Sequence, residues 1–199
     1  MKSTRLCTVP ECAGRHRSLG YCNKHYIQYR RYGKIVDYRP AVFDGKNWLI
    51  PLGVGARDGY AIIDESFKWL AKYKWYLSCG YALSRGPRGV RQMHRVITGA
   101  SVGQIVDHAN RNRLDNRLSN LRICTHRQNQ ANSTRKSKSG AKGVDVRSSN
   151  RYVAYIRRGG KRIYLGTYHT LVEAARAYDR AAVKMFGEYA YTNKMNGLY

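Results

Sequence analysis

Residues 104–129 read QIVDHANRNRLDNRLSNLRICTHRQN. A short apolar run ends in the pair Asp107 and His108, and a polar loop follows this pair. Asn120 then precedes a second short apolar run, and Asn129 lies near the start of the segment that follows it. Short apolar runs bounded by turn-forming residues are typical of strands. The stretch therefore predicts two strands, a loop between them and a helix after the second strand.

The polar residues of this stretch fit the chemistry of phosphodiester hydrolysis. That reaction needs an activated water, a cation on the scissile phosphate and stabilisation of the leaving oxygen. His108 is a candidate general base, because an imidazole titrates near neutral pH. Asp107 faces the opposite side of the strand or turn, where its carboxylate can bind metal. Hard divalent ions prefer oxygen ligands, and an asparagine oxygen adds one without adding charge.

Residues 92–130 resemble the HNH, or ββα-metal, endonucleases, and are most similar to the homing endonucleases of phages and mobile introns. The resemblance implies that His108 is the general base. It implies that Asp107 and Asn129 are the protein ligands of the catalytic ion, Mg²⁺ or Mn²⁺. It also implies that Asn120 holds the loop between the two strands by hydrogen bonds.

Other residues around this motif leave alternatives open. The segment Gln92-Met-His-Arg-Val-Ile97 also resembles the part that precedes the site in homing endonucleases. Its His94 is a further candidate for the catalytic set, and either contacts a DNA phosphate or braces the strand. His126 lies close to Asn129 in the sequence and competes with it for the role of ligand. Four arginines are candidates for neutralising phosphates: Arg95, Arg111, Arg113 and Arg122.

The N-terminal residues 1–38 predict a zinc knuckle. Two ligand pairs with the spacing Cys-x4-Cys and Cys-x2-His, nine residues apart, suit a tetrahedral zinc ion. The ligands are Cys7, Cys12, Cys22 and His25, with His16 as an alternative for the fourth. Because a module this short cannot bury a hydrophobic core, metal binding would supply its folding free energy. Aromatic and basic residues alternate over 26–34, and among them Arg30 and Arg31 are candidates for contacting nucleic acid.

The C-terminal residues 143–193 predict a three-stranded sheet followed by a helix. Alternation and a tight Arg-Gly-Gly turn predict strands at 143–147, 152–157 and 161–166. Thr170 and Glu173 form a capping box for a helix over 171–186 with a stripe of small apolar residues. One side of the sheet should meet this helix. The other side carries basic and aromatic residues that suit the major groove of DNA: Arg147, Arg151, Tyr155, Arg157, Arg162 and Tyr164.

This C-terminal region resembles the APETALA2-type domain of plant ethylene-response factors, which is also found attached to HNH homing endonucleases. The resemblance rests on Gly143-Val, Tyr155-Ile-Arg, Tyr164-Leu-Gly-Thr-Tyr and Glu173-Ala-Ala-Arg-Ala-Tyr-Asp-Arg-Ala-Ala. It implies base and phosphate contacts from the arginines of the sheet and from Tyr164. Asp145 stands where the plant domains carry arginine after Gly-Val, so the plant target sequence does not carry over.

The fold class that we expect is α+β with several modules. In the middle region we expect strands at 48–52, 60–63, 75–76 and 81–83, and a helix from a cap at Asp64 to about residue 73. The modules are then a zinc knuckle (1–38), an HNH nuclease domain with extra strands (42–133), a linker (134–142) and an APETALA2-type DNA-binding domain (143–193).

Charge and hydropathy limit the classes of partner. The formal net charge of +25 favours a polyanion, with nucleic acid as the first candidate. We find neither an apolar stretch that could span a bilayer nor a signal core, and therefore expect a cytoplasmic, DNA-associated protein of a bacterial or phage-infected cell, with no membrane partner.

These features together predict a site-specific, homing-type endonuclease that acts as a monomer on double-stranded DNA. Two alternatives remain open: a DNA-binding regulator with an inactive HNH core, and a protein that binds or cleaves RNA. Competition between duplex DNA and RNA would separate the last of these.

Overall fold

The computed structural model describes residues 5–10, 12–35, 40–53, 58–87, 89–134, 136–147 and 151–199, and of Tyr32 the backbone only. These residues form short helices and small antiparallel sheets of two or three strands. They divide into two compact units, one made of Met1–Met93 with Leu114–Asn116 and the other of His94–Arg113 with Arg117–Tyr199. The α+β, multi-module class predicted from the sequence is confirmed. No helix within the described residues is both long enough and apolar enough to cross a bilayer.

The first unit begins with a small cysteine-containing module. Strand β1 (His16–Ser18) pairs antiparallel with β2 (Tyr21–Cys22), and helix α1 (Asn23–Tyr32) follows directly. Gly33 ends α1 in the left-handed conformation, with φ of 69°, and its N–H donates to the carbonyl of Tyr29. The sequence predicted the metal ligands of this module but not its two short strands.

Two three-stranded sheets make up the rest of the first unit. One contains β3 (Val42–Phe43), β4 (Trp48–Pro51) and β5 (Tyr60–Ile63), and the other β6 (Tyr76–Ser78), β7 (Tyr81–Gly86) and β8 (Gly89–Gln92). The helix expected after Asp64 is a 3₁₀ helix, η2 (Glu65–Lys72), and the Asp64 side chain makes no capping hydrogen bond. Its Leu70 is buried with Ile50, Leu52 and Ile63, so these sheets have an apolar core of their own.

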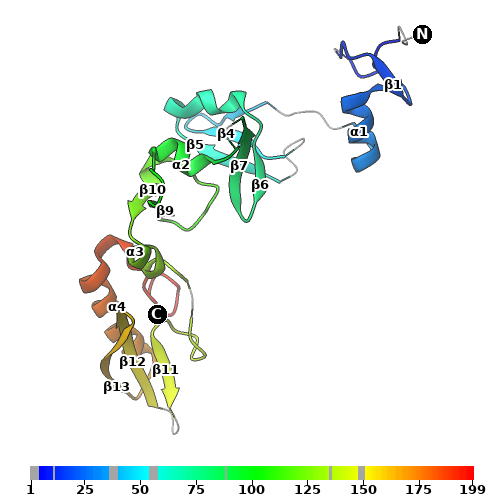
Figure 1. Cartoon of the computed structure of the whole chain (residues 1–199). Helices are drawn as coiled ribbons and strands as arrows, with labels where there is room; N and C mark the ends of the chain where they lie inside the picture. The colour runs from blue at the N-terminus through cyan, green and yellow to red at the C-terminus, as the bar shows by residue number, and fades with distance from the viewer. Residues whose placement is uncertain are drawn as a thin grey trace. The chain divides into compact units, whose positions relative to one another are not determined.

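The second unit begins with a ββα arrangement. Helix α2 (Met93–Thr98) spans the boundary between the units and leads to β9 (Ile105–His108), the 3₁₀ turn η3 (Leu118–Asn120), β10 (Leu121–Cys124) and helix α3 (His126–Ala131) (Figure 1). Strands β9 and β10 pair antiparallel, with Arg122 opposite Asp107. Thr125 caps α3 through a capping box with Gln128.

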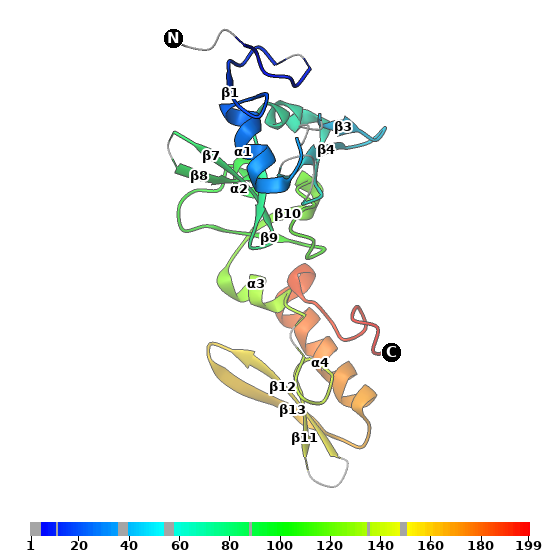
Figure 2. The same ribbon diagram turned by 90° about the vertical axis from the view of Figure 1, so that its right-hand side faces the viewer.

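The rest of the second unit is a sheet of β11 (Val144–Arg147), β12 (Arg151–Arg158) and β13 (Lys161–Tyr168) with helix α4 (Leu171–Phe186) packed on β12 and β13 (Figure 2). The predicted helix bounds and the Thr170–Glu173 capping box are confirmed. Small side chains let helix and sheet approach closely, and the fully buried residues of this core are Ala141, Val144, Ala154, Ala174 and Ala175. A 3₁₀ turn, η4 (Gly187–Tyr189), begins the C-terminal segment.

Gly143 lies where this core leaves no room for a side chain. Its φ is +70°, and a Cβ there would lie 2.0 Å from Cδ2 of Tyr178 and 2.8 Å from the carbonyl oxygen of Tyr155. Gly143→Ala should therefore cost about 1–2 kcal/mol of backbone strain and about 1–3 kcal/mol of overpacking in unfolding free energy.

Gly140→Ala is a matched control for this variant. Gly140 has a similar φ of +84° but no atom within 4 Å of its ideal Cβ, so only the strain should appear. Denaturant unfolding of both variants separates strain from clash. Equal losses of unfolding free energy would contradict the packing described here.

Candidate active site

Asp107 and His108 end strand β9 in a buried position, with 6% and 4% of their surfaces exposed. Successive side chains of a strand point to opposite faces, so the two residues have different neighbours. The Asp107 side chain faces that of Arg122 on β10, and the His108 ring faces that of His94 on α2. The sequence therefore places an acid and a base back to back on one short strand.

The His108 ring packs on the ring of His94. The ring centroids are 5.3 Å apart and the rings are tilted by 74°. Burial lowers the pKa of His94 to about 4, and electrostatic interactions with His108 and Arg95 add to this effect. His94 is thus a neutral imidazole at neutral pH. Of the two roles left open for it, bracing the strand, through its contact with the His108 ring, fits its burial better than contact with a DNA phosphate.

Asn120 lies under the loop that follows His108. Its side-chain oxygen accepts a hydrogen bond from the backbone N–H of Asn110 at 2.9 Å, and its carbonyl accepts one from Ala109 at 2.9 Å. The N–H of Arg111 donates back to the carbonyl of His108 at 2.8 Å. These bonds hold the loop between β9 and β10, hereafter the catalytic loop, against the start of β10.

The Asp107 carboxylate is bound by two side chains. Arg122 donates from Nε at 3.0 Å and from Nη2 at 2.8 Å, both to Oδ2. Asn132 donates from Nδ2 to both carboxylate oxygens at 3.0 Å, and also to the carbonyl of His108 at 2.9 Å. Oδ1 thus accepts fewer of the described hydrogen bonds than Oδ2, and a carboxylate oxygen has room for further partners.

The structure brings Asn132, rather than the predicted Asn129, to Asp107. Asn129 lies on α3 with its side chain exposed, and the competing His126 is also exposed and contacts Gln130. The sequence reasoning missed Asn132, although a signal was present. Asparagines three residues apart lie on the same side of a helix, so Asn129 and Asn132 were equivalent candidates for that side.

The carboxylate oxygens of Asp107 are ligands that a hard divalent cation such as Mg²⁺ or Mn²⁺ prefers. The side chains that contact them, Arg122 and Asn132, do so through N–H donors. Strand β9 carries the Asp107 carboxylate, and α3 carries the side-chain amide of Asn129, the second expected ligand. Arg122 gives Asp107 a positive partner, so a cation would bind through Oδ1 or displace the guanidinium.

Arginines expected to face phosphates also have partners within the protein. The Arg95 guanidinium donates to the carbonyls of Ala100, Ser101 and Gln104. Arg122 binds Asp107, and the Arg111 guanidinium lies 3.5 Å from the ring centre of Tyr191. These residues shape the site before any nucleic acid is present.

The four N-terminal ligands form a second site. One donor atom from each of Cys7, Cys12, Cys22 and His25 lies within 4.8 Å of the others. Zn–S bonds of about 2.3 Å and Zn–N bonds of about 2.0–2.1 Å place the ligand atoms of a tetrahedral site about 3.5–3.8 Å apart. The Sγ atoms of Cys12 and Cys22 are 3.8 Å apart, and Cys22 Sγ is 3.6 Å from Nδ1 of His25. This cluster can therefore hold a zinc ion.

Local chemistry supports metal binding at this cluster. Burial opposes ionisation of Cys7, but hydrogen bonds from the Cys22 backbone and the His25 ring outweigh it and lower the pKa of Cys7 to about 6. Thiolates are the form that binds zinc. Gly14 packs against the cysteine cluster, and a Cβ at this position would lie 2.7 Å from Cβ of Cys22, so a side chain here would disturb the cluster. His16, the alternative ligand, instead accepts a hydrogen bond from the N–H of Gly20.

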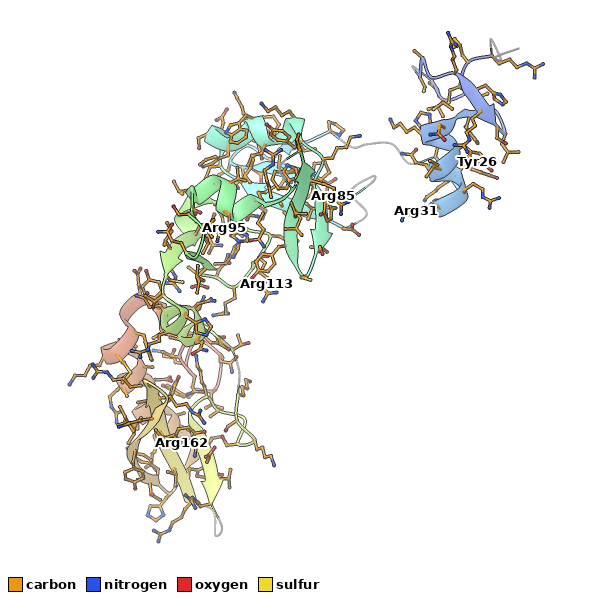
Figure 3. The ribbon with its side chains drawn as sticks, viewed as in Figure 1. Tyr26, Arg31, Arg85, Arg95, Arg113 and Arg162 are labelled. Atoms are coloured by element: carbon orange, nitrogen blue, oxygen red, sulfur yellow. The ribbon has the colours of Figure 1, made fainter. Side chains whose placement is uncertain are left out.

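The residues expected to bind DNA lie on exposed surfaces. Arg30 and Arg31 are exposed in the last turn of α1, and Tyr26 and Arg31 extend from this helix (Figure 3). On the C-terminal sheet the exposed side chains include Arg147, Arg151, Arg157, Arg162 and Tyr164. Tyr155 is half-buried among them.

Asp145, which departs from the plant pattern, has two partners on this sheet. The hydroxyl of Tyr155 donates to Oδ1 of Asp145 at 3.0 Å, and Arg162 forms an ion pair with Oδ2 at 3.3 Å. The Arg162 guanidinium also stacks on the Tyr155 ring, 3.9 Å from its centre. Burial raises the pKa of Tyr155, and the hydrogen bond to Asp145 adds to this effect.

Comparisons with known proteins match two regions of the chain. Residues 91–131 match the family model for HNH endonucleases, and residues 139–188 match that for AP2 domains. An uncharacterised HNH endonuclease of Acanthamoeba polyphaga mimivirus is 38% identical over 138 residues, covering 65% of this chain and 72% of the viral protein.

The plant relatives match over one domain. APETALA2-like protein 2 of Oryza sativa subsp. indica is 48% identical over 54 residues, 26% of this chain and 12% of that protein. An ethylene-responsive transcription factor of Arabidopsis thaliana is 42% identical over 67 residues, 30% of this chain and 42% of that protein. The viral relative, by contrast, shares most of its length with the present protein. The chain belongs to the HNH endonuclease family and carries an AP2 domain after its nuclease motif.

Proposed function

We propose that this protein is a site-specific, homing-type endonuclease that hydrolyses double-stranded DNA with one divalent metal ion and His108 as general base. The observation that carries the proposal is the buried pair of Asp107 and His108 on β9, held in place by β10 and α3. An acid and a base in this arrangement meet the needs of phosphodiester hydrolysis.

Each residue of the site has a distinct role in this proposal. His108 accepts the proton of the attacking water at a ring nitrogen, and His94 braces its ring. Asp107 and Asn129 are the ligands of Mg²⁺ or Mn²⁺, which supplies positive charge to the phosphate when bound. Asn120 keeps the catalytic loop in shape. Asn132 and Arg122 position the Asp107 carboxylate rather than touch the reacting atoms.

The flanking modules select the DNA site. We propose a zinc knuckle at 1–38, a nuclease domain at 42–133, a linker at 134–142 and an AP2 domain at 143–193 that reads DNA with its exposed sheet. The net charge of +25 supports binding to a polyanion. The protein would act as a monomer on DNA in the cytoplasm, with Arg30 and Arg31 adding backbone contacts.

A cleavage assay on a supercoiled plasmid library tests this function. The library carries DNA that flanks the gene, and the protein is added with Mg²⁺, with Mn²⁺ or with EDTA. Nicked or linear product that requires the metal supports the endonuclease. Tight, salt-sensitive binding without product across the library would instead support a regulator with an inactive core. Preferential cleavage of RNA competitor over duplex DNA would contradict the choice of substrate.

A further inference from the structure

The C-terminal residues 187–193, here called the strap, run from the end of α4 back to the nuclease motif. At its start, Nη1 of Arg122 donates to the carbonyl of Glu188 at 2.9 Å. The guanidinium of Arg122 lies 4.2 Å from the ring centre of Tyr189. The Tyr189 hydroxyl donates to the carbonyl of Ile123 at 3.4 Å. All three contacts involve residues of β10, and Arg122 is the residue that binds the carboxylate of Asp107.

The middle of the strap contacts the catalytic loop and the end of α3. Tyr191 is 5% exposed, and its N–H donates to the carbonyl of Ala131 at 3.1 Å. Its ring carries the Arg111 guanidinium at 3.5 Å, and Arg111 belongs to the catalytic loop. Nζ of Lys142 donates hydrogen bonds to the carbonyls of Ala131, Ser133 and Tyr191, at 2.6, 2.7 and 3.3 Å.

The far end of the strap is fixed to the AP2 helix. Asn193 is 1% exposed, and both its backbone N–H and its Nδ2 donate to Oδ1 of Asp179 on α4, at 2.8 and 3.0 Å. Its own Oδ1 accepts from the N–H of Lys142 at 2.7 Å. The strap is therefore held at one end by α4 and contacts the nuclease motif along its length.

These contacts join the two matched regions and extend past the end of the second. The HNH match ends at residue 131 and the AP2 match ends at residue 188. Tyr191 and Asn193 lie beyond both matches, and so does the contact of Arg111 with Tyr191. The connection therefore includes residues beyond both matches, and each of its steps is a hydrogen bond or ring contact between described residues.

We propose that the strap is a positioning element, which fixes Asp107 and His108 relative to the AP2 sheet so that the cut falls at one set distance from the sequence that the sheet binds. This inference rests on the proposed endonuclease function. Two paths transmit the position: from Tyr189 through Arg122 to Asp107, and from Tyr191 through Arg111 to the carbonyl of His108.

The alternative is that residues 134–142 alone join the two parts as a flexible tether. A flexible chain of nine residues has a root-mean-square span of about 15–18 Å. With a rise of about 3.4 Å per base pair, such a tether would spread the cut over roughly five base pairs. Loss of the strap contacts should therefore spread the cleavage positions over that range. The intact protein should cut each strand at one position.

The test compares full-length variants on the target DNA by sequencing the cut ends. Tyr191→Leu removes the ring under Arg111, and Tyr191→Phe keeps the ring while losing the hydroxyl contacts to Met195 and Asn196. We expect spread cuts from Tyr191→Leu, one position from Tyr191→Phe, and DNA affinity within about twofold of wild type for both. Tyr199→Leu is the matched control, because Tyr199 stacks with Arg176 and binds Asp179, both on α4, and these contacts do not involve the catalytic loop.

A second variant and a second readout keep the outcomes distinct. Arg111→Asn removes the stacking from the nuclease side, and asparagine tolerates the φ of 63° at that position. Amide hydrogen exchange at 109–111 without DNA should quicken at least tenfold in Tyr191→Leu and in Arg111→Asn, but not in Tyr199→Leu. Unchanged exchange, or one cut position in all variants, overturns the positioning role. If the wild-type protein cuts no DNA, the endonuclease proposal fails while exchange still decides whether the strap holds the loop.

Discussion

His108→Ala should lower the rate of DNA cleavage by about 10²–10⁴-fold, the contribution typical of a positioned general base. DNA affinity should stay near that of wild type, because His108 is 4% exposed and the basic surfaces of the sheet and of α1 are unchanged. Single-turnover cleavage at saturating protein, with the dissociation constant measured in the absence of metal, separates the two effects.

The control for this prediction is His169→Ala. His169 is an exposed histidine between β13 and α4, away from the buried pair on β9. Its replacement should leave the single-turnover rate within about twofold of wild type. Full cleavage by His108→Ala would show that another group activates the water, and would refute the assignment of the base.

Removal of zinc should unfold the N-terminal module while leaving the other domains folded. Structural zinc in small modules contributes about 10–16 kcal/mol of apparent binding free energy at neutral pH, which is more than so small a core can supply. Cys22→Ser removes one ligand from the cluster, so we expect loss of the bound metal and fast amide exchange over 12–33. The sheets of the first unit keep their own core of Ile50, Leu52 and Ile63.

Cys79→Ser is the control for the zinc prediction, because Cys79 is exposed and lies outside the cluster. Elemental analysis should give one zinc per chain in the wild type and in Cys79→Ser, and less than a tenth of that in Cys22→Ser. Slow exchange over 12–33 in a metal-free protein would contradict the role of zinc in folding this module.

Local sequence signals predicted the elements whose stability is decided locally. The capping box and the alanine stripe of α4 lie within one helix, and the predicted range 171–186 matches the structure. Strand β5 likewise matches at Tyr60–Ile63. By contrast, β3, β8 and α2 span two to six residues, and so few residues carry too little periodicity for a prediction.

Contacts between distant residues could not be predicted in the same way. Asn132 meets Asp107 across 25 residues of sequence, and Arg122 meets Glu188 across 66. Asn129 and Asn132 lie on the same side of the helical segment, but Asn132, which follows the last residue of α3, contacts Asp107 while Asn129 is exposed, and the sequence pattern did not distinguish them. Ala141, placed in the predicted linker, is fully buried in the AP2 core, because the small side chain fits under α4.

The contacts of Asp145 on the AP2 sheet change how arginine contributes to binding. The Arg162 guanidinium already forms an ion pair with Asp145 and stacks on the Tyr155 ring. A phosphate or base that recruits Arg162 must take it from Asp145, so the event is an exchange of partners rather than the capture of a free cation. Fewer counterions would be released than the number of arginines on the sheet indicates, and the salt dependence of binding would be shallower. DNA binding at Arg162 then depends on whether a phosphate or base accepts hydrogen bonds from its guanidinium more favourably than the Asp145 carboxylate does.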